Sequence, residues 1–277
     1  MRPIGGGQVI DIQSFNKTEH FKIGTLELCY SGGKDSDVIL HLANMAGIKY
    51  QAIYKNTTID PPGTEKHARD NNCIVAKPQK TFFELIASNG LPSRFSRFCC
   101  SKLKEYKIGE VAIYGIRRDE SAKRAERYKE PNFCRVYSKK EKTHVWLPIL
   151  EWTKDDVAEF VNSEGIKCHE LYYDDCGRFH AERRLGCIGC PLQSRKHRLE
   201  EFKTYPKFLR RWVIQAQKFV ETHMDSPNIQ RFNSGANMMF FQLFCDNMEQ
   251  YNLKTKGMFG DLDCKQYLED YFKIDLP

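Results

Sequence analysis

The sequence predicts an α/β protein, a doubly wound and mostly parallel sheet with a helical C-terminal element. Two observations support this fold class. Strand and helix signals alternate through the first half of the 277-residue chain, which is typical of a parallel sheet with helices on both faces. From about residue 197 onward, aromatic and apolar residues recur at helical spacing. We therefore expect residues 1–196 to form the sheet domain and residues 197–277 a helical element whose aromatic and methionine side chains form core.

Each predicted strand leads through a loop into a helix. The expected strands cover residues 25–30, 50–54, 73–76 and 111–116, and the helices after the first three end near residues 46, 70 and 88. A hairpin pairs residues 134–137 with 144–147 around a charged loop, and Thr153 caps a helix that ends near residue 163. Ligands of such sheets bind beyond the carboxyl ends of the strands. The loops that follow the strands are therefore the expected site.

The composition is that of a globular protein without a membrane partner. Hydrophobic residues make up 41% of the chain and charged residues 29%. No apolar run reaches the roughly 18 residues of a membrane span, and residues 1–22 lack the apolar segment of a secretory signal. We expect a cytoplasmic location. In that reducing compartment, eleven cysteines indicate metal or redox chemistry rather than disulfides.

The formal net charge of +7 is unevenly distributed. Residues 117–142 carry ten Lys or Arg and five Asp or Glu, a net charge of +5. Residues 178–211 carry ten Lys or Arg and three Asp or Glu, a net charge of +7. Such stretches suit a polyanion, either a phosphorylated nucleotide or a nucleic acid. A solvated basic face is the alternative for each stretch.

Residues 31–36 read Ser-Gly-Gly-Lys-Asp-Ser and stand where a strand should turn into a helix. Two glycines allow a tight turn that brings backbone N–H groups close to a bound group, and the helix that follows points its positive end at the same spot. Hydroxyls and a lysine add further donors, so the segment predicts a cradle for phosphate or pyrophosphate. It is not a P-loop, whose spacing is absent. The candidates are Ser31, Gly32, Gly33, Lys34, Asp35 and Ser36, of which Lys34 and Asp35 are also catalytic candidates.

A second anion-binding candidate follows the fourth predicted strand, in the segment from Gly115 to Ser121. A bidentate Arg117 beyond a strand end suits phosphate or sulfate oxygens, and it is the third catalytic candidate. We expect Glu120 to orient Arg117, Ser121 to donate to an oxygen, and Arg124 to lie one helical turn later. The alternative is a charged helix start with local ion pairs.

Four cysteines have the spacing of metal ligands. Cys99 and Cys100 are adjacent, and Cys187 and Cys190 form a C-x-x-C knuckle flanked by small residues. An adjacent pair is unusual for zinc because consecutive side chains diverge, whereas a larger iron–sulfur cluster can take one thiolate on each of two irons. A zinc ion at the same four residues, unliganded buried thiols, and Cys176 in place of one ligand remain alternatives.

In their order along the chain, these motifs resemble those of the phosphoadenosine phosphosulfate (PAPS) reductase family in the adenine-nucleotide α-hydrolase superfamily. Residues 31–36 are similar to its S-G-G-x-D-S pyrophosphate loop and residues 115–121 to its G-x-R-x-x-E-S motif. The four cysteines resemble the ligands of the four-iron, four-sulfur cluster in one branch of the family. Over roughly residues 20–195, the resemblance implies that the chain binds ATP or a related adenine nucleotide with Mg²⁺. It also implies that Thr57 and Asp60 lie near ribose or phosphate.

The resemblance leaves three functions open. We favour an ATP pyrophosphatase that activates DNA or tRNA for sulfur transfer from a donor protein, and a homodimer is a further arrangement to consider. The first alternative is a reductase that forms sulfite from a sulfonucleotide with thioredoxin. That reaction uses a cysteine in an E-C-G-L-H motif, and Cys264, its nearest counterpart, lacks the glycine and the histidine. The second alternative is a non-catalytic nucleotide-binding subunit.

Overall fold

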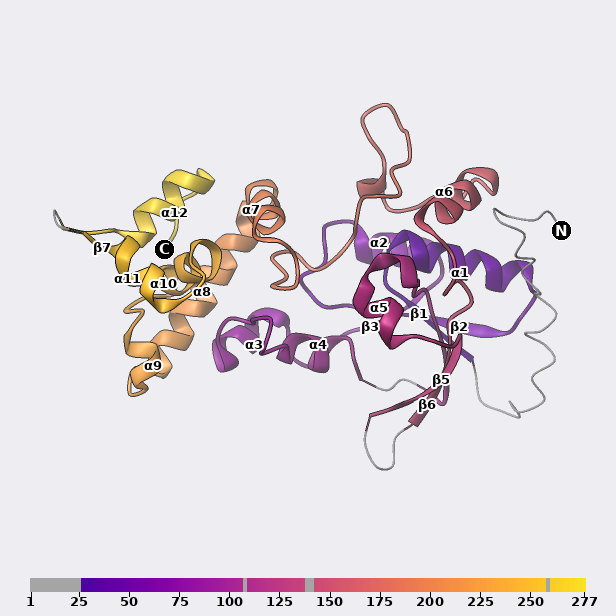
Figure 1. Cartoon of the computed structure of the whole chain (residues 1–277), viewed down its shortest axis with the longest axis horizontal. Helices are drawn as coiled ribbons and strands as arrows, with labels where there is room; N and C mark the ends of the chain where they lie inside the picture. The colour runs from indigo at the N-terminus through magenta and orange to yellow at the C-terminus, as the bar shows by residue number, and fades with distance from the viewer. Residues whose placement is uncertain (1–25, 107–108, 138–141, 258–259) are drawn as a thin grey trace. The chain divides into compact units, whose positions relative to one another are not determined.

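The computed structural model describes residues 26–106, 109–137, 142–257 and 260–277 (Figure 1). The predictions for residues 1–22 and for most of the charged hairpin loop therefore lie outside the described residues. The chain forms two compact units. Unit 1 comprises the described residues up to Asn56, Pro61–Lys77 and Tyr106–Gly186, and unit 2 comprises Thr57–Asp60, Pro78–Glu105 and Cys187–Pro277.

These units differ from the predicted split at residue 196. Residues 57–60 and 78–105 come from the first half of the sequence, yet they pack with the helical C-terminal region. These segments join unit 2 because they contact residues that are distant in the sequence. The N–H of Ile188 donates to the carbonyl of Ile59 (2.9 Å), and Phe82 of this segment packs against Trp212, with ring centroids 4.9 Å apart.

Unit 1 contains a six-stranded sheet in the order β3-β2-β1-β4-β6-β5. All neighbouring strands are parallel except β5 and β6, which form the predicted hairpin. The mostly parallel sheet confirms the predicted fold class. The strands are β1 (Leu26–Tyr30), β2 (Tyr50–Lys55), β3 (Ile74–Ala76), β4 (Val111–Tyr114), β5 (Asn132–Val136) and β6 (Lys142–Trp146).

The order of the strands creates a switch point at β1. From β1 the chain moves outward to β2 and β3, and it then returns to β4 on the other side of β1. Since β1 and β4 are parallel neighbours, the loops that follow them leave the same edge of the sheet. In open α/β sheets, ligands bind in the crevice at such a point.

In the described part of unit 1, the α-helices that accompany the sheet are α1 (Lys34–Met45), α2 (Thr64–Asp70), α5 (Ala122–Arg127) and α6 (Lys154–Ser163). As predicted, Thr153 caps α6, in a reciprocal capping box with Asp156. The helix α1 buries Val38 and Ile39 on one face, in a core that also contains Leu28, Ile113 and Ile149. This apolar stripe anchors the helix whose first turn forms the loop site.

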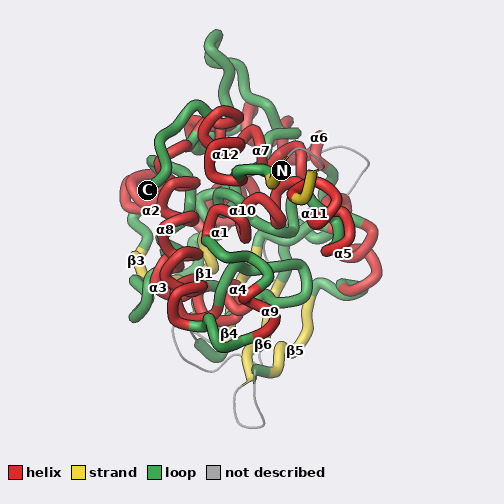
Figure 2. Tube along the Cα trace, turned by 90° about the vertical axis from the view of Figure 1, so that its left-hand side faces the viewer, coloured by secondary structure: helices red, strands yellow, loops and turns green. Residues whose placement is uncertain are grey.

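Unit 2 is mainly helical (Figure 2). Its core includes Phe202, Trp212, Met239 and Leu268, so the aromatic and methionine side chains of the C-terminal region form core, as predicted. None of the helices in the described ranges is both long and apolar enough to cross a membrane. The elements are α3 (Phe82–Asn89), α4 (Phe98–Leu103), α7 (Arg195–Thr204), α8 (Pro206–Thr222), α9 (Pro227–Gln230), α10 (Gly235–Phe244), α11 (Met248–Thr255), β7 (Lys256–Gly257), β8 (Gly260–Asp261) and α12 (Cys264–Phe272).

The end of β4 meets the first turn of α1 without room for a side chain. A Cβ on Gly115 would lie 2.6 Å from the carbonyl oxygen of Asp35 and 3.2 Å from the amide of Ser36. We expect Gly115→Ala to lower the free energy of unfolding by about 1–3 kcal/mol in urea titrations. It should also weaken nucleotide binding, because the backbone of the loop must shift.

Gly47→Ala is the matched control. It adds a methyl group to a turn in which no atom lies within 4 Å, so it should lower stability only through its left-handed backbone. Nucleotide binding should stay unchanged in this variant. A Gly115→Ala protein with the stability and nucleotide affinity of the parent would contradict the close contact.

Candidate functional site

The loop after β1 has the backbone that the sequence predicts. Gly32 adopts a left-handed conformation (φ +77°), and a Cβ there would lie 2.7 Å from Cγ2 of Thr64. Gly33 is the N-cap of α1 and makes no side-chain capping bond. The positive end of a twelve-residue helix therefore faces the loop without a capping side chain, which favours a bound anion.

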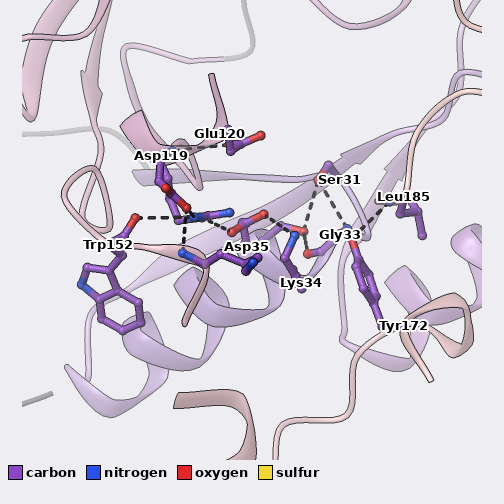
Figure 3. A network of polar contacts seen from close by, with 12 residues as sticks. Ser31, Gly33, Lys34, Asp35, Asp119, Glu120, Trp152, Tyr172 and Leu185 are labelled. Carbon is purple, nitrogen blue, oxygen red and sulfur yellow. Dashed lines mark hydrogen bonds and ion pairs between the residues drawn. The ribbon is translucent and has the colours of Figure 1, made fainter. Parts of the chain in front are cut away.

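The two serines of the loop hold its shape. The hydroxyl of Ser36 donates to the carbonyl of Gly33 (2.6 Å), and the hydroxyl of Ser31 donates to that of Ser36 (3.3 Å). The amide of Gly33 in turn donates to Oγ of Ser31 (3.4 Å; Figure 3). The loop is thus organised by its own side chains before any ligand binds.

A buried ion-pair network lies beside this loop and centres on Arg117, which is only 3% exposed. Its Nε donates to Asp35 (2.6 Å), and its Nη1 donates to Asp119 (3.0 Å) and to the carbonyl of Trp152 (3.5 Å; Figure 3). Burial alone would lower the pKa of Arg117. The carboxylates of Asp35 and its other acidic neighbours together raise the pKa by more than burial lowers it, so the net shift is upward. Lys34 completes the network through Asp35 (3.3 Å).

The structure gives the rest of the second motif local roles. Glu120 accepts from the backbone amide of Arg117 (3.4 Å) and pairs with Arg124, so the contact between Glu120 and Arg117 that the structure gives is made through the backbone. Oγ of Ser121 accepts the amide of Arg124 (3.3 Å) as the N-cap of α5. These contacts correspond to the alternative of local ion pairs at a helix start. The Arg117 guanidinium is engaged by carboxylates, and it fixes Asp35 in the first turn of α1.

Sequence reasoning missed Tyr172, which lies against the loop. Its hydroxyl accepts the amide of Leu185 (3.3 Å) and would be 3.3 Å from a Cβ on Gly33 (Figure 3). Nζ of Lys34 lies 5.3 Å from the centroid of its ring. No motif surrounds Tyr172, so the sequence carried no signal for it. Asp119 was also missed, although it stands inside the second motif.

A second carboxylate of α1 fixes α2 beside the loop. Asp37 is buried and accepts the hydroxyl of Tyr30, and its Oδ1 lies 3.0 Å from Nε2 of His67 in α2. Burial raises the pKa of Asp37, and the bonds from His67 and Tyr30 oppose that shift. These three residues were not predicted as site residues, because a Tyr, an Asp and a His so far apart in the sequence have no recognisable spacing.

The four predicted cysteine ligands all lie in unit 2 and line one pocket. Cys99 and Cys100 come from α4, a helix that the sequence analysis did not predict. Cys187 and Cys190 lie on a turn closed by the amide of Cys190 and the carbonyl of Cys187 (3.2 Å). Gly189 permits this turn, because its φ is +73° and a Cβ there would lie 2.3 Å from Phe202.

Thr57 and Asp60 lie beside these cysteines. Sγ of Cys187 is 3.7 Å from Oγ1 of Thr57 and 3.6 Å from Oδ1 of Asp60. Nζ of Lys104 is 3.6 Å from the same carboxylate oxygen. Burial raises the pKa of Cys187 to about 12, and the Lys104 ammonium opposes that shift. The expected contact of Thr57 and Asp60 with ribose or phosphate stays a prediction, and their observed neighbour is a thiol.

The donor set of the pocket fits an iron–sulfur cluster. Four cysteines line the pocket, and Trp212, another lining residue, has an Nε1 atom that is buried without an acceptor in the described part of the chain. Within the same ranges, no group of three or more His, Cys, Asp or Glu side chains is arranged to hold a metal ion. Cys99, Cys100, Cys187 and Cys190 would hold a cluster or, in the alternative, a zinc ion.

Comparison with known proteins establishes the family. Residues 25–193 match the phosphoadenosine phosphosulfate reductase domain, which covers more than half of the chain. The chain therefore belongs to the PAPS reductase family, as the motifs indicated.

Two relatives illustrate the range of this family. The chain is 29% identical over 218 residues to an uncharacterised protein of Methanocaldococcus jannaschii, covering 73% of this chain and 49% of the relative. It is 27% identical over 177 residues to adenosine 5′-phosphosulfate reductase of Streptomyces coelicolor, covering 58% of this chain and 70% of the reductase. It thus spans about half the length of the archaeal protein.

Among solved structures, the chain is similar to the U34-tRNA thiolase of Methanococcus maripaludis, solved with its [4Fe-4S] cluster. The identity is 14% and the TM-score 0.36, over 74% of this chain and 72% of that one.

The Arg117 network makes a prediction for stability. Because Arg117→Ala removes the buried cation that pairs with both Asp35 and Asp119, we expect a loss of about 3–5 kcal/mol in the free energy of unfolding, measured by urea titration. Arg117→Lys should lose less, since it keeps the charge but not the planar fork.

The double variant Arg117→Ala with Asp35→Asn serves as the control. Its loss of unfolding free energy should be clearly smaller than the sum of the losses in the two single variants, because the Asn side chain introduced at position 35 carries no charge that needs a partner. Additive losses would show that the two residues do not stabilise each other.

Proposed function

We propose that this protein binds ATP at the loop of residues 31–36, releases pyrophosphate, and activates a nucleic acid for sulfur transfer. One observation carries the proposal. The uncapped N-terminus of α1, organised by Ser31 and Ser36, faces the switch point of a parallel sheet in a PAPS reductase family domain. Backbone N–H groups in that position suit the two phosphates of a leaving pyrophosphate.

In the proposed reaction, an oxygen of the acceptor attacks the α-phosphorus of ATP. The bond from that phosphorus to the bridging oxygen breaks, and pyrophosphate leaves with its electron pair. Hydrosulfide from a sulfur donor protein then attacks the acceptor carbon that bears the adenylated oxygen. The bond from this carbon to the oxygen breaks, and AMP leaves with the oxygen. Lys34 would offset charge on the leaving pyrophosphate, and the Arg117–Asp35 pair would hold the first turn of α1 in place. Mg²⁺ would neutralise further phosphate charge.

The cysteines would serve the sulfur step or stabilise unit 2. Cys99, Cys100, Cys187 and Cys190 would hold a four-iron, four-sulfur cluster, which can bind or relay sulfur when present. The acceptor would be DNA or tRNA, because the basic stretches suit phosphate contacts. A homodimer is compatible with this proposal.

The resemblance to adenosine 5′-phosphosulfate reductase favours a second candidate, a reductase that forms sulfite with thioredoxin. The state of Cys264 opposes it. This residue is 2% exposed at the start of α12, and burial, Cys245 and Asp263 raise the pKa of its thiol to about 12. A nucleophilic thiolate needs exposure and a lowered pKa. A non-catalytic nucleotide-binding subunit is the further alternative.

The first test is ATP turnover by the anaerobically purified protein. We expect ATP-dependent release of AMP and pyrophosphate that increases when DNA or tRNA is added. Lys34→Ala should reduce the rate by about 10²-fold or more, as removal of a single transition-state donor does. Cys264→Ser should leave it unchanged. Sulfite release from a sulfonucleotide with thioredoxin, abolished by Cys264→Ser, would instead establish the reductase.

A second test concerns the cysteine pocket. Iron and sulfide analysis should find about four of each per chain. Trp212→Phe should keep that content but lower the reduction potential, because it removes a buried N–H that has no acceptor among the described residues and belongs to a side chain of the pocket wall. Phe219→Leu, in the same helix but outside the pocket, is the control and should not change the potential. Colourless protein with one zinc per chain would contradict the cluster.

A further inference from the structure

The loop before α4 exposes an aromatic ring completely. Phe95 is 101% exposed, the highest value among the exposed large hydrophobic side chains. The loop around it is nonetheless ordered by its own hydrogen bonds. Oγ of Ser93 accepts the amides of Phe95 (3.2 Å) and Ser96 (2.9 Å), and the amide of Ser93 donates to the carbonyl of Ser96 (3.1 Å). A preorganised loop thus presents a ring that no residue of its own unit covers.

This loop is tied directly to the cysteine knuckle. Nε of Arg94 donates to the carbonyl of Pro191 (3.1 Å), and its Nη2 donates to that of Gln193 (3.4 Å). Both carbonyls follow Cys190 in the chain, and Cys99 lies four residues after Phe95. Phe95 is therefore held close to the pocket that the four cysteines line.

Arg195 and Arg198 lie one turn apart on α7, and Arg94 of the loop carries a third guanidinium group. Arg198 is 9% exposed; burial lowers its pKa, and the positive charges of Arg195 and Arg94 lower it further. Nη2 of Arg198 donates to the carbonyl of Gln242 (3.5 Å), and Nη2 of Arg195 contacts Asp246 and the carbonyl of Cys245 (3.2 Å).

Two donors of this group remain unused. Nε of Arg195 and Nε of Arg198 are both buried, and neither has a hydrogen-bond partner among the residues that the structure describes. The positive charges of these arginines suit a phosphate. The surrounding charge agrees with this assignment, since residues 93–104 contain four Lys or Arg and no Asp or Glu.

We propose that Phe95 stacks on an unpaired base of a single-stranded nucleic acid, while Arg94, Arg195 and Arg198 hold a neighbouring phosphate. Aromatic rings stack on any exposed base, whereas a base pair hides both faces of its bases within the duplex. The inference rests on the proposed function, because it specifies the acceptor as an unpaired nucleotide presented beside the cysteine pocket.

The test uses the full-length protein and fluorescein-labelled oligonucleotides of one sequence, as a single strand and as a duplex, with anisotropy as the readout. The single strand should bind more tightly than the duplex. Phe95→Ala should weaken single-strand binding by roughly ten-fold or more, and Phe95→Trp should preserve it. Arg195→Gln should instead reduce the slope of log affinity against log salt by about one phosphate contact.

Leu253→Ala is the matched control, since Leu253 is also exposed (75%) in unit 2 and should not affect binding. Equal binding by Phe95→Ala and the parent, equal affinity for strand and duplex, or no oligonucleotide binding at all would overturn the proposal. Its failure is distinguishable from that of the proposed function. Oligonucleotide-stimulated pyrophosphate release with an unchanged affinity of Phe95→Ala refutes only the role of Phe95, and oligonucleotide binding without pyrophosphate release refutes only the ATP chemistry.

Discussion

The buried ion pair between Arg117 and Asp35 fixes the geometry on which the nucleotide site depends. It joins the loop after β4 to the first turn of α1 over 2.6 Å. Gly115 allows the same two segments to meet backbone to backbone. Since Asp35 belongs to the turn that presents the helix N-terminus, its position sets the orientation of the donors that would face a phosphate. In the proposed site, Arg117 therefore acts through Asp35, and the backbone and hydroxyls of the loop would bind the anion.

The cysteine pocket depends on a comparable constraint in unit 2. Gly189 lets the knuckle turn against Phe202, and the bond from Ile188 to Ile59 joins the knuckle to the segment that carries Thr57 and Asp60. Cys187 consequently has polar neighbours, although it lies in an otherwise apolar pocket. In the proposed cluster site, an acid, a hydroxyl and a lysine around one cysteine would tune its thiolate.

Much of the fold was predictable because its signals are local. Alternation in residues 25–30 and helical spacing after Lys34 reflect side chains that the structure places in the core. The cap at Thr153 and the turn at residues 31–33 likewise need only neighbouring residues. These parts of the sequence determine their own backbone, so the sheet and its first loop could be inferred without tertiary information.

The remaining features arise from contacts between distant segments. Nothing near Tyr172 indicates that its hydroxyl lies at Gly33, and nothing near Thr57 indicates a neighbour 130 residues away. The motif around Arg117 marks an arginine that the structure buries in an ion-pair network, but its pairing with Asp35 spans 82 residues and could not be inferred from spacing. The split at residue 196 followed a change of composition, whereas the compact units follow long-range packing.

A structure of the anaerobically purified protein with a non-hydrolysable ATP analogue is the most direct test of this interpretation. We expect the terminal phosphates at the amides of Gly32, Gly33 and the first turn of α1, with the Arg117–Asp35 pair intact beside them. Phosphates bound elsewhere, with the loop of residues 31–36 left vacant at saturating analogue, would contradict it.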